Sequence, residues 1–263
     1  ALILDRENGI YADPEKVHYL NHKGRWFQSR GPLNIPQSPQ GRPVIIQAGS
    51  SGRGKAFAAR WSDVIFALQP NLERMRAFRA DISQALVDAG RGPDASKVMM
   101  AIMPFVGESR AEAEEKLALH DSLVDPVVGL STLAAHANAD FSHFSLDEAV
   151  ESIQSSGSQG NLAALKSIAA GKSITIGDAG RIYGQGVMCP RLVGTAKDVA
   201  EEMAEIVISR AADGFVVSPA FLPDTFENFV GKVVPILQEK GLFRTEYEGN
   251  TLRDHLGLGA EQD

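Results

Sequence analysis

The sequence predicts an α/β fold made of about four βα units, half of a (β/α)8 barrel. Short apolar runs alternate with amphipathic helical segments, which is typical of a parallel sheet. The first of these runs leads straight into a glycine- and serine-rich turn, as a strand does before a helix. A closed barrel has eight strands in about 250 residues. This chain of 263 residues is therefore expected to be the carboxyl-terminal half of a larger barrel chain, with open sheet edges.

The first unit carries the predicted binding site. Residues 43–48 form an apolar run, which we expect to be a strand buried on both faces. It ends at Gly49, Ser50 and Ser51, and the alanine-rich segment up to Trp61 predicts a helix capped by one of the two serines. Glycines let the backbone approach a ligand closely, and unpaired amides at a helix start bind anions. We interpret the turn as a phosphate site, although a turn that only caps the helix has the same sequence pattern.

The following segments were assigned in chain order. Residues 1–42 are a turn-rich lead-in, in which 17–20 and 25–29 are expected to pair as a hairpin. Three βα units are expected in 43–124, an insertion in 125–190, a final unit in 191–241 and a polar tail in 242–263. The later strands and helices are expected at Asp63–Leu68, Asn71–Ala89, Val98–Val106, Ser109–Leu123, Ala196–Ala211 (capped by Thr195), Gly214–Pro219 and Asp224–Glu239.

Composition limits the classes of function. The net charge of -7 predicts no basic surface for nucleic acid or a membrane. No apolar run approaches the roughly 20 residues of a membrane span, and the single Cys189 fits a reducing cytoplasm. The first residues, Ala-Leu-Ile-Leu-Asp, include no initiator methionine, so we expect a fragment or a processed chain.

Several runs together resemble one enzyme family. They are Asn21-His22-Lys23-Gly24, Arg30-Gly31-Pro32-Leu33-Asn34, Pro39-Gln40-Gly41-Arg42-Pro43-Val44, Gln47-Ala48-Gly49-Ser50-Ser51, Val193-Gly194-Thr195, Asp213-Gly214-Phe215 and residues 242–249. In this order they resemble the bacterial-luciferase-like flavin monooxygenases, in the branch of nitrilotriacetate, dibenzothiophene-sulfone and long-chain alkane monooxygenases. The combination covers nearly the whole chain.

The resemblance implies a (β/α)8 barrel with a large insertion and a two-component monooxygenase reaction. Reduced FMN would come from a separate flavin reductase, and one oxygen atom of O2 would enter a small organic substrate. Gly49, Ser50 and Ser51 would hold the FMN phosphate. The residues that such enzymes use on the flavin ring lie mostly in the first half of the barrel, so this chain's own FMN binding is open. We also expect a homo-oligomer.

No catalytic residue is assigned from the sequence. His136 and His143 fall in the insertion, where a histidine could act as an acid or base or position the substrate, but surface histidines have the same pattern. The six histidines lack ligand spacing, so no metal site is expected. Two alternatives remain: a catalytically silent half-barrel that self-associates, and a barrel that binds another phosphorylated ligand.

Overall fold

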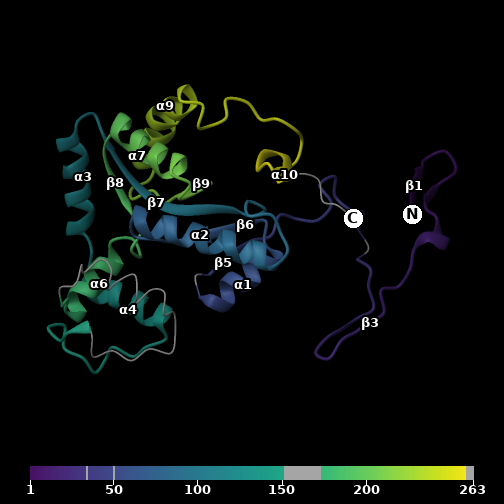
Figure 1. The fold of residues 1–263 in the computed structure, drawn as a ribbon, viewed down its shortest axis with the longest axis horizontal. Coiled ribbons are helices and arrows are strands. Elements are labelled where there is room, and N and C mark those ends of the chain that lie inside the picture. The colour runs from purple at the N-terminus through teal and green to yellow at the C-terminus, as the bar shows by residue number, and fades with distance from the viewer. Residues whose placement is uncertain (34, 50, 151–172, 259–263) are drawn as a thin grey trace.

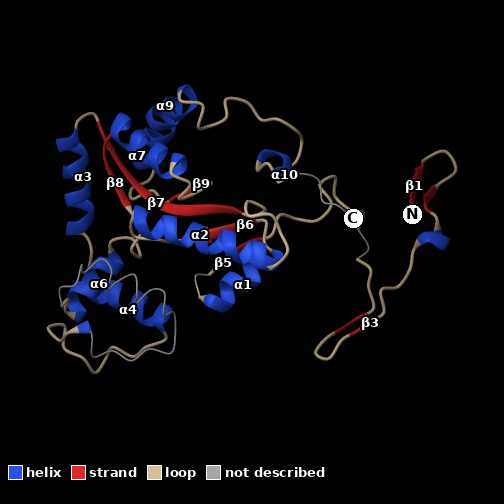
Figure 2. Ribbon diagram, viewed as in Figure 1, coloured by secondary structure: helices blue, strands red, loops and turns tan. Residues whose placement is uncertain are grey.

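A parallel sheet forms the centre of the molecule. The computed structural model describes residues 1–33, 35–49, 51–150 and 173–258. All pairs between the five strands of this sheet are parallel, which confirms the predicted α/β class (Figures 1 and 2). Four strands follow the order β5 (Ile46–Ala48), β6 (Val64–Ala67), β7 (Lys97–Gly107) and β8 (Arg191–Thr195), and β9 (Gly214–Val217) pairs with β7.

The prediction of four strands was one strand short, because it missed β8. This strand has five residues and includes Arg191 and Gly194, so it lacks the apolar run by which the other strands were recognised. It pairs with Met103–Gly107 in the second half of β7. The first half of β7 pairs with β6 and β9. The 11-residue strand β7 therefore holds the whole sheet together.

The helices begin at the predicted caps. The Asn71 side chain accepts a hydrogen bond from the Arg74 amide, and Ser109 and Thr195 cap their helices in the same way. Such a bond satisfies an amide that has no partner inside the helix. The helices of the sheet region are α1 (Gly52–Trp61), α2 (Leu72–Asp88), α3 (Arg110–Ser122), α7 (Ala196–Ile208), α8 (Asp224–Asn228) and α9 (Val234–Glu239), with a π-helical turn at Phe229–Val233 between the last two.

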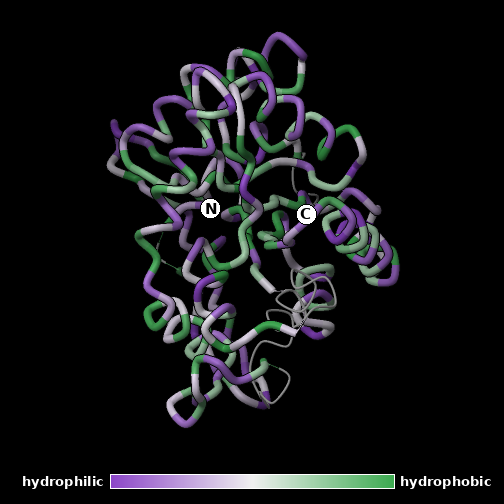
Figure 3. The backbone as a smooth tube through the Cα atoms, turned by 90° about the vertical axis from the view of Figure 1, so that its left-hand side faces the viewer, coloured by the Kyte–Doolittle hydropathy of each residue, from purple (hydrophilic) through white to green (hydrophobic). Residues whose placement is uncertain are grey.

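Helices α1, α2, α7 and α9 cover one face of the sheet, and α3 covers part of the other face, beside the second half of β7. Ile65 and Ala67 of β6 and Met100 of β7 pack with α1 and α2 in a buried cluster. Side chains alternate between faces along a strand, so the residues between them point to the opposite face. There Ile46 is 62% exposed and Val216 is 41% exposed. In Figure 3 the surrounding helices alternate between hydrophobic and hydrophilic residues, as expected for helices with one covered face.

The prediction that the first strand is buried on both faces was wrong. Among the residues that the structure describes, β5 pairs with β6 alone and so lies at the edge of the sheet. Ile46 belongs to no buried cluster of the described residues, and its side chain is mostly exposed. The apolar side chains of β5 are typical of a strand that packs against other apolar groups. The described residues contain no such group over Ile46.

Two helices of the insertion pack closely through glycines. They are α4 (Pro126–Ala137) and α6 (Ile176–Gly184). A Cβ atom at Gly129 would overlap the Gly180 carbonyl oxygen, and one at Gly184 would lie 2.6 Å from the Val124 side chain. Leu68, just after β6, packs against the core of this helix pair. Residues 151–172 of the predicted insertion lie outside the described residues.

The lead-in forms short hairpins that lie apart from the sheet (Figure 1). Its elements are β1 (Leu2–Asp5), β2 (Ile10–Ala12), a 3-10 turn (Pro14–Lys16), β3 (His22–Lys23) and β4 (Gln28–Ser29). The predicted hairpin of 17–20 with 25–29 was partly wrong, because β4 pairs with 22–23 instead. Many large apolar side chains of the lead-in are exposed, including Trp26 at 74% and Phe27 at 81%.

Asp63 joins three distant parts of the chain. Its carboxylate is 2.7 Å from Arg42 Nη1 and 3.2 Å from Arg253 Nη1, and it accepts a hydrogen bond from the Ile45 amide. Arg253 lies on α10 (Leu252–His255), in the carboxyl-terminal tail. Burial on its own would raise the pKa of Asp63, but Arg42, the Ile45 amide and Arg253 together lower it below the ordinary value. One carboxylate thus fixes the lead-in, β5 and the tail.

Replacing Asp63 with Asn is expected to lower the free energy of unfolding by about 3 kcal/mol at pH 7, because the buried Arg253 would lose the charge of a carboxylate that lies 3.2 Å from its Nη1. The pKa of Asp63 is lowered by folding. Its contribution is therefore complete above the unfolded pKa of about 4 and is lost as the pH falls through the folded value. Urea unfolding at pH 7 and pH 3 measures both effects. The exposed Asp88→Asn is the control, and equal losses in the two variants would contradict the prediction.

Replacing Gly129 with Ala is expected to destabilise the α4–α6 pair by about 1–3 kcal/mol, because the added methyl group meets backbone rather than a flexible side chain. Gly231→Ala is the matched control, since an added Cβ there has no atom within 4 Å and alanine favours a helix. Thermal unfolding followed by circular dichroism compares the two. A Gly129→Ala variant as stable as Gly231→Ala would show that the helices can separate without cost.

Candidate functional site

The candidate site lies at the carboxyl edge of the parallel sheet. Because the strands are parallel, the residues that follow β5, β6 and β9 gather at the same edge. Gly49 follows β5 directly, and Leu68 follows β6. In open α/β sheets this edge is where ligands bind.

The Gly49–Ser51 turn connects β5 to α1. A Cβ atom at Gly49, where φ is 157°, would lie 3.0 Å from Gln47 Nε2, so the turn leaves little room for a side chain. Ser51 is the N-cap of α1, and its hydroxyl oxygen accepts a hydrogen bond from the Gly54 amide at 3.1 Å. This confirms the prediction that one of the two serines caps the helix. Ser50 lies outside the described residues.

The first turn of α1 is open to an incoming anion. The Gly52 and Arg53 amides donate no hydrogen bond to any residue that the structure describes. A Cβ atom placed on Gly52 would have no atom within 4 Å, and Ser51 is exposed. Free amides at the positive end of a helix dipole suit a phosphate group. The turn thus presents free amides on an open surface.

An apolar cluster lies beside the strand ends, on the face opposite to α1 and α2, where Leu117 of α3 also packs. Ala101, Met103 and Phe105 of β7 pack there with Cys189. Burial raises the pKa of the Cys189 thiol to about 12, so the thiol stays protonated at neutral pH and is a poor nucleophile.

The two residues that directly precede Cys189 have an uncommon backbone conformation. Val187 has a φ of 55° and Met188 has a φ of 62°, which is the left-handed region that residues with a Cβ atom rarely adopt. Met188 and Cys189 line a cleft of about 290 Å³ that Pro70, after β6, also borders. Strained backbone of this kind concentrates at functional sites. No sequence signal marked these positions, because neither residue is a glycine or an asparagine.

The two histidines of the insertion have different surroundings. His136 Nδ1 lies 2.6 Å from the hydroxyl oxygen of Tyr183, which is itself buried. The His143 side chain is 83% exposed and lies 3.4 Å from Asp140. Neither contact involves the Gly49–Ser51 turn.

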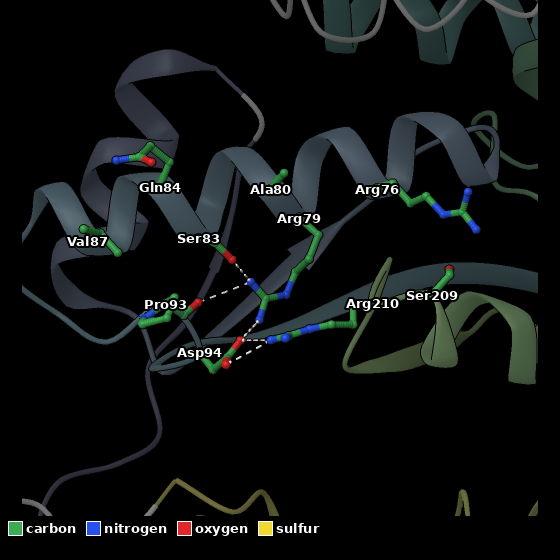
Figure 4. A pocket seen from close by; sticks show the side chains of 10 residues that line it. All are labelled: Arg76, Arg79, Ala80, Ser83, Gln84, Val87, Pro93, Asp94, Ser209 and Arg210. Carbon is green, nitrogen blue, oxygen red and sulfur yellow. Dashed lines mark hydrogen bonds and ion pairs between the residues drawn. The ribbon is translucent and has the colours of Figure 1, made fainter.

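A second groove runs along the side of α2 and reaches the amino edge of the sheet at Pro93, Asp94 and Arg210. It has a volume of about 610 Å³ and contains three arginines (Figure 4). Arg76 and Arg79 come from α2, and Arg210 lies between α7 and β9. The sequence did not predict this groove. Its residues are scattered over 76–94 and 209–210, so no local motif could reveal it.

The described residues lack two kinds of feature. They contain no helix with the length and apolar character required to cross a bilayer. They also contain no group of three or more His, Cys, Asp or Glu side chains arranged to hold a metal ion.

Comparisons with known proteins agree on one family. A family model described as luciferase-like monooxygenase matches residues 15–213. The chain is 46% identical over 267 residues to dibenzothiophene-sulfone monooxygenase of Rhodococcus erythropolis, with 100% of this chain and 59% of that protein covered. It is 38% identical over 261 residues to nitrilotriacetate monooxygenase component A of Aminobacter aminovorans, with 98% and 58% covered.

A solved structure has the same fold. DmoA from Hyphomicrobium sulfonivorans matches with a TM-score of 0.87 and 30% sequence identity, over 98% of this chain and 55% of that chain. The chain thus spans less than two thirds of the length of these relatives. The family model alone covers most of the sequence, and the chain belongs to the luciferase-like monooxygenase family.

Proposed function

We propose that this chain is part of an FMNH2-dependent monooxygenase of the two-component class, which inserts one oxygen atom from O2 into a small organic substrate. The observation that carries the proposal is the open first turn of α1 at the carboxyl edge of the sheet. The names of the relatives support the reaction class, since they are monooxygenases of a sulfone and of nitrilotriacetate. The name "component A" supports a second component, which we propose is a flavin reductase.

The phosphate of FMN would be held by the Gly49–Ser51 turn. The Gly52 and Arg53 amides and the Ser51 hydroxyl would donate to its oxygens, and Ser50 is proposed to do the same. The chain's residues fit a phosphate because the turn is exposed and leaves space at Gly52. Bound reduced FMN would supply the electrons that activate O2. A related solved structure, of a riboflavin lyase, is described with modified FMN, which supports a flavin.

We propose that the sheet is part of a (β/α)8 barrel. Its segments would be the lead-in (1–42), three βα units (43–124), the insertion (125–190), a final unit (191–241) and the tail (242–263). The support is the position of the exposed apolar side chains. Ile46 on β5 and Phe57 and Trp61 on α1 are each more than half exposed, and they lie on the edge strand and on the helix that follows it. A further βα unit packed at this edge would bury them.

The proposed surroundings are the cytoplasm, with small-molecule substrate and O2 as reactants. The acidic net charge and the single cysteine support this setting. Self-association is also proposed, because an unpaired strand edge is a template for pairing with another chain.

Replacing Ser50 and Ser51 with Ala is expected to weaken FMN binding by about tenfold or more, because hydroxyl donors to a charged phosphate are lost. Riboflavin lacks the phosphate, so its affinity should change by less than about threefold. Flavin fluorescence titration measures both ligands. Equal losses for FMN and riboflavin would contradict the phosphate assignment, and no FMN binding by the unmodified chain in the micromolar range would contradict the proposed function for this chain.

The matched control for this variant is Ser109→Ala. Ser109 caps α3 as Ser51 caps α1, with a 3.2 Å hydrogen bond from the Glu112 amide. Its loss destabilises a helix by a comparable amount, about 1 kcal/mol, without touching the turn after β5. FMN affinity should be unchanged in Ser109→Ala.

Replacing Ile46 with Lys is expected to shift the chain towards monomer, because a charge on an edge strand opposes edge-to-edge pairing. Sedimentation velocity over a range of concentrations measures the association. Val127→Lys on α4 is the control, since Val127 is also exposed but lies away from β5. A monomer at every concentration before substitution, or an equal effect of both lysines, would count against association through β5.

A further inference from the structure

Gln47 is the polar residue of strand β5, which otherwise consists of Ile46 and Ala48 and leads through the Gly49–Ser51 turn into α1 (Figure 1). It lies in register with Ile65 of β6, whose side chain is buried against α1 and α2. Because residues in register on adjacent strands point to the same face of a sheet, the Gln47 side chain lies on the helix-covered face. A carboxamide on an otherwise apolar face needs an explanation.

The Gln47 carboxamide packs against the start of the turn. Its Nε2 donates to the Ala48 carbonyl oxygen at 2.9 Å. A Cβ atom at Gly49 would lie 3.0 Å from the same Nε2 and 3.8 Å from Gln47 Oε1. The carboxamide therefore occupies the space that a side chain at Gly49 would need, and it holds the carbonyl that directly precedes the turn.

This hydrogen bond sets the direction of the Gly49 amide. The Ala48–Gly49 peptide bond is trans, and in a planar trans peptide the C=O and N–H bonds point in opposite directions. With its carbonyl bonded to Gln47 Nε2, the peptide directs the Gly49 N–H away from Gln47. Within the described part of the chain this N–H donates no hydrogen bond. The first amide of the turn is thus oriented by a side chain and has no acceptor of its own.

The other end of the carboxamide is unfavourable for stability. Gln47 Oε1 is buried and accepts no hydrogen bond from any residue that the structure describes. A buried acceptor without a donor lowers the free energy of unfolding. An apolar side chain of similar length, such as methionine, would avoid this cost. Departures of this kind from favourable packing are expected at functional sites.

We propose that Gln47 is a positioning residue for the Gly49–Ser51 turn, and that the Gly49 amide it orients is a further donor to the phosphate of FMN. This inference rests on the proposed function. Gln47 itself would make no contact with the flavin and would act only through the Ala48–Gly49 peptide. A residue that only filled space beneath α1 would have the opposite signature, because its loss would lower stability and weaken all flavins alike.

Replacing Gln47 with Met tests the proposal. FMN is expected to bind about tenfold more weakly, because a donor to a charged phosphate loses its fixed direction. Riboflavin affinity should change by less than about threefold, since riboflavin has no phosphate. The unfolding temperature should stay the same or rise, because the unpaired buried oxygen is removed and the exposed Ala48 carbonyl can bond to water. Flavin fluorescence titration and thermal unfolding followed by circular dichroism measure these quantities.

Gln238→Met is the matched control. Gln238 on α9 is also half-buried, and its Nε2 donates to the Arg244 carbonyl oxygen at 2.8 Å, far along the chain from β5. Its loss should leave FMN affinity unchanged. Equal losses of FMN and riboflavin in Gln47→Met, or an equal loss of FMN in both glutamine variants, would overturn the proposal.

The same titrations separate this inference from the proposed function. Unchanged FMN affinity in Gln47→Met, beside a loss in the Ser50 and Ser51 variant, would overturn the role of Gln47 and leave the phosphate assignment standing. Failure of the unmodified chain to bind FMN would overturn both.

Discussion

The buried carboxylate of Asp63 is the interaction on which the arrangement of the chain depends. It is bonded to Arg42 at the end of the lead-in, to the Ile45 amide before β5 and to Arg253 near the carboxyl end. A buried carboxylate is unfavourable without partners, so these three segments must come together when β6 forms. The tail has few apolar contacts of its own, and the ion pair between Arg253 and Asp63 holds it against the sheet region.

The two edges of the sheet have different chemistry, and this follows from the parallel arrangement of the strands. The carboxyl edge presents backbone amides at the glycine–serine turn and an apolar cluster around Met103 and Cys189. The amino edge presents charged side chains. There Asp63, Asp94 and Asp213 each form an ion pair with an arginine. Side chains at the amino edge bond mainly to one another and so stabilise the fold. At the carboxyl edge, backbone donors remain open to a ligand.

Much of the fold could be predicted because local signals were strong. The caps at Asn71, Ser109 and Thr195 and the apolar strands β6, β7 and β9 lie where the sequence placed them. β8 escaped detection because a short strand that contains glycine has no apolar period. The burial of β5 was mispredicted because exposure depends on neighbours that a strand's own sequence does not reveal. Of the candidate site, the Ser51 cap was predictable, whereas the left-handed Val187 and Met188 and the arginine groove arise from tertiary contacts.

The glycine contacts between α4 and α6 have a mechanical consequence. Helices whose backbones touch cannot slide past each other, so the pair moves as one block or not at all. Only the short connectors at 123–125 and 185–190 can then absorb a displacement. The second connector contains the left-handed residues Val187 and Met188, and the Asp121–Arg191 ion pair lies across its end. Rotation of the block over the strand ends would therefore act on the connector at 185–190. There the relief of backbone strain at Val187 and Met188 would favour the rotation, and the rupture of the Asp121–Arg191 ion pair would oppose it.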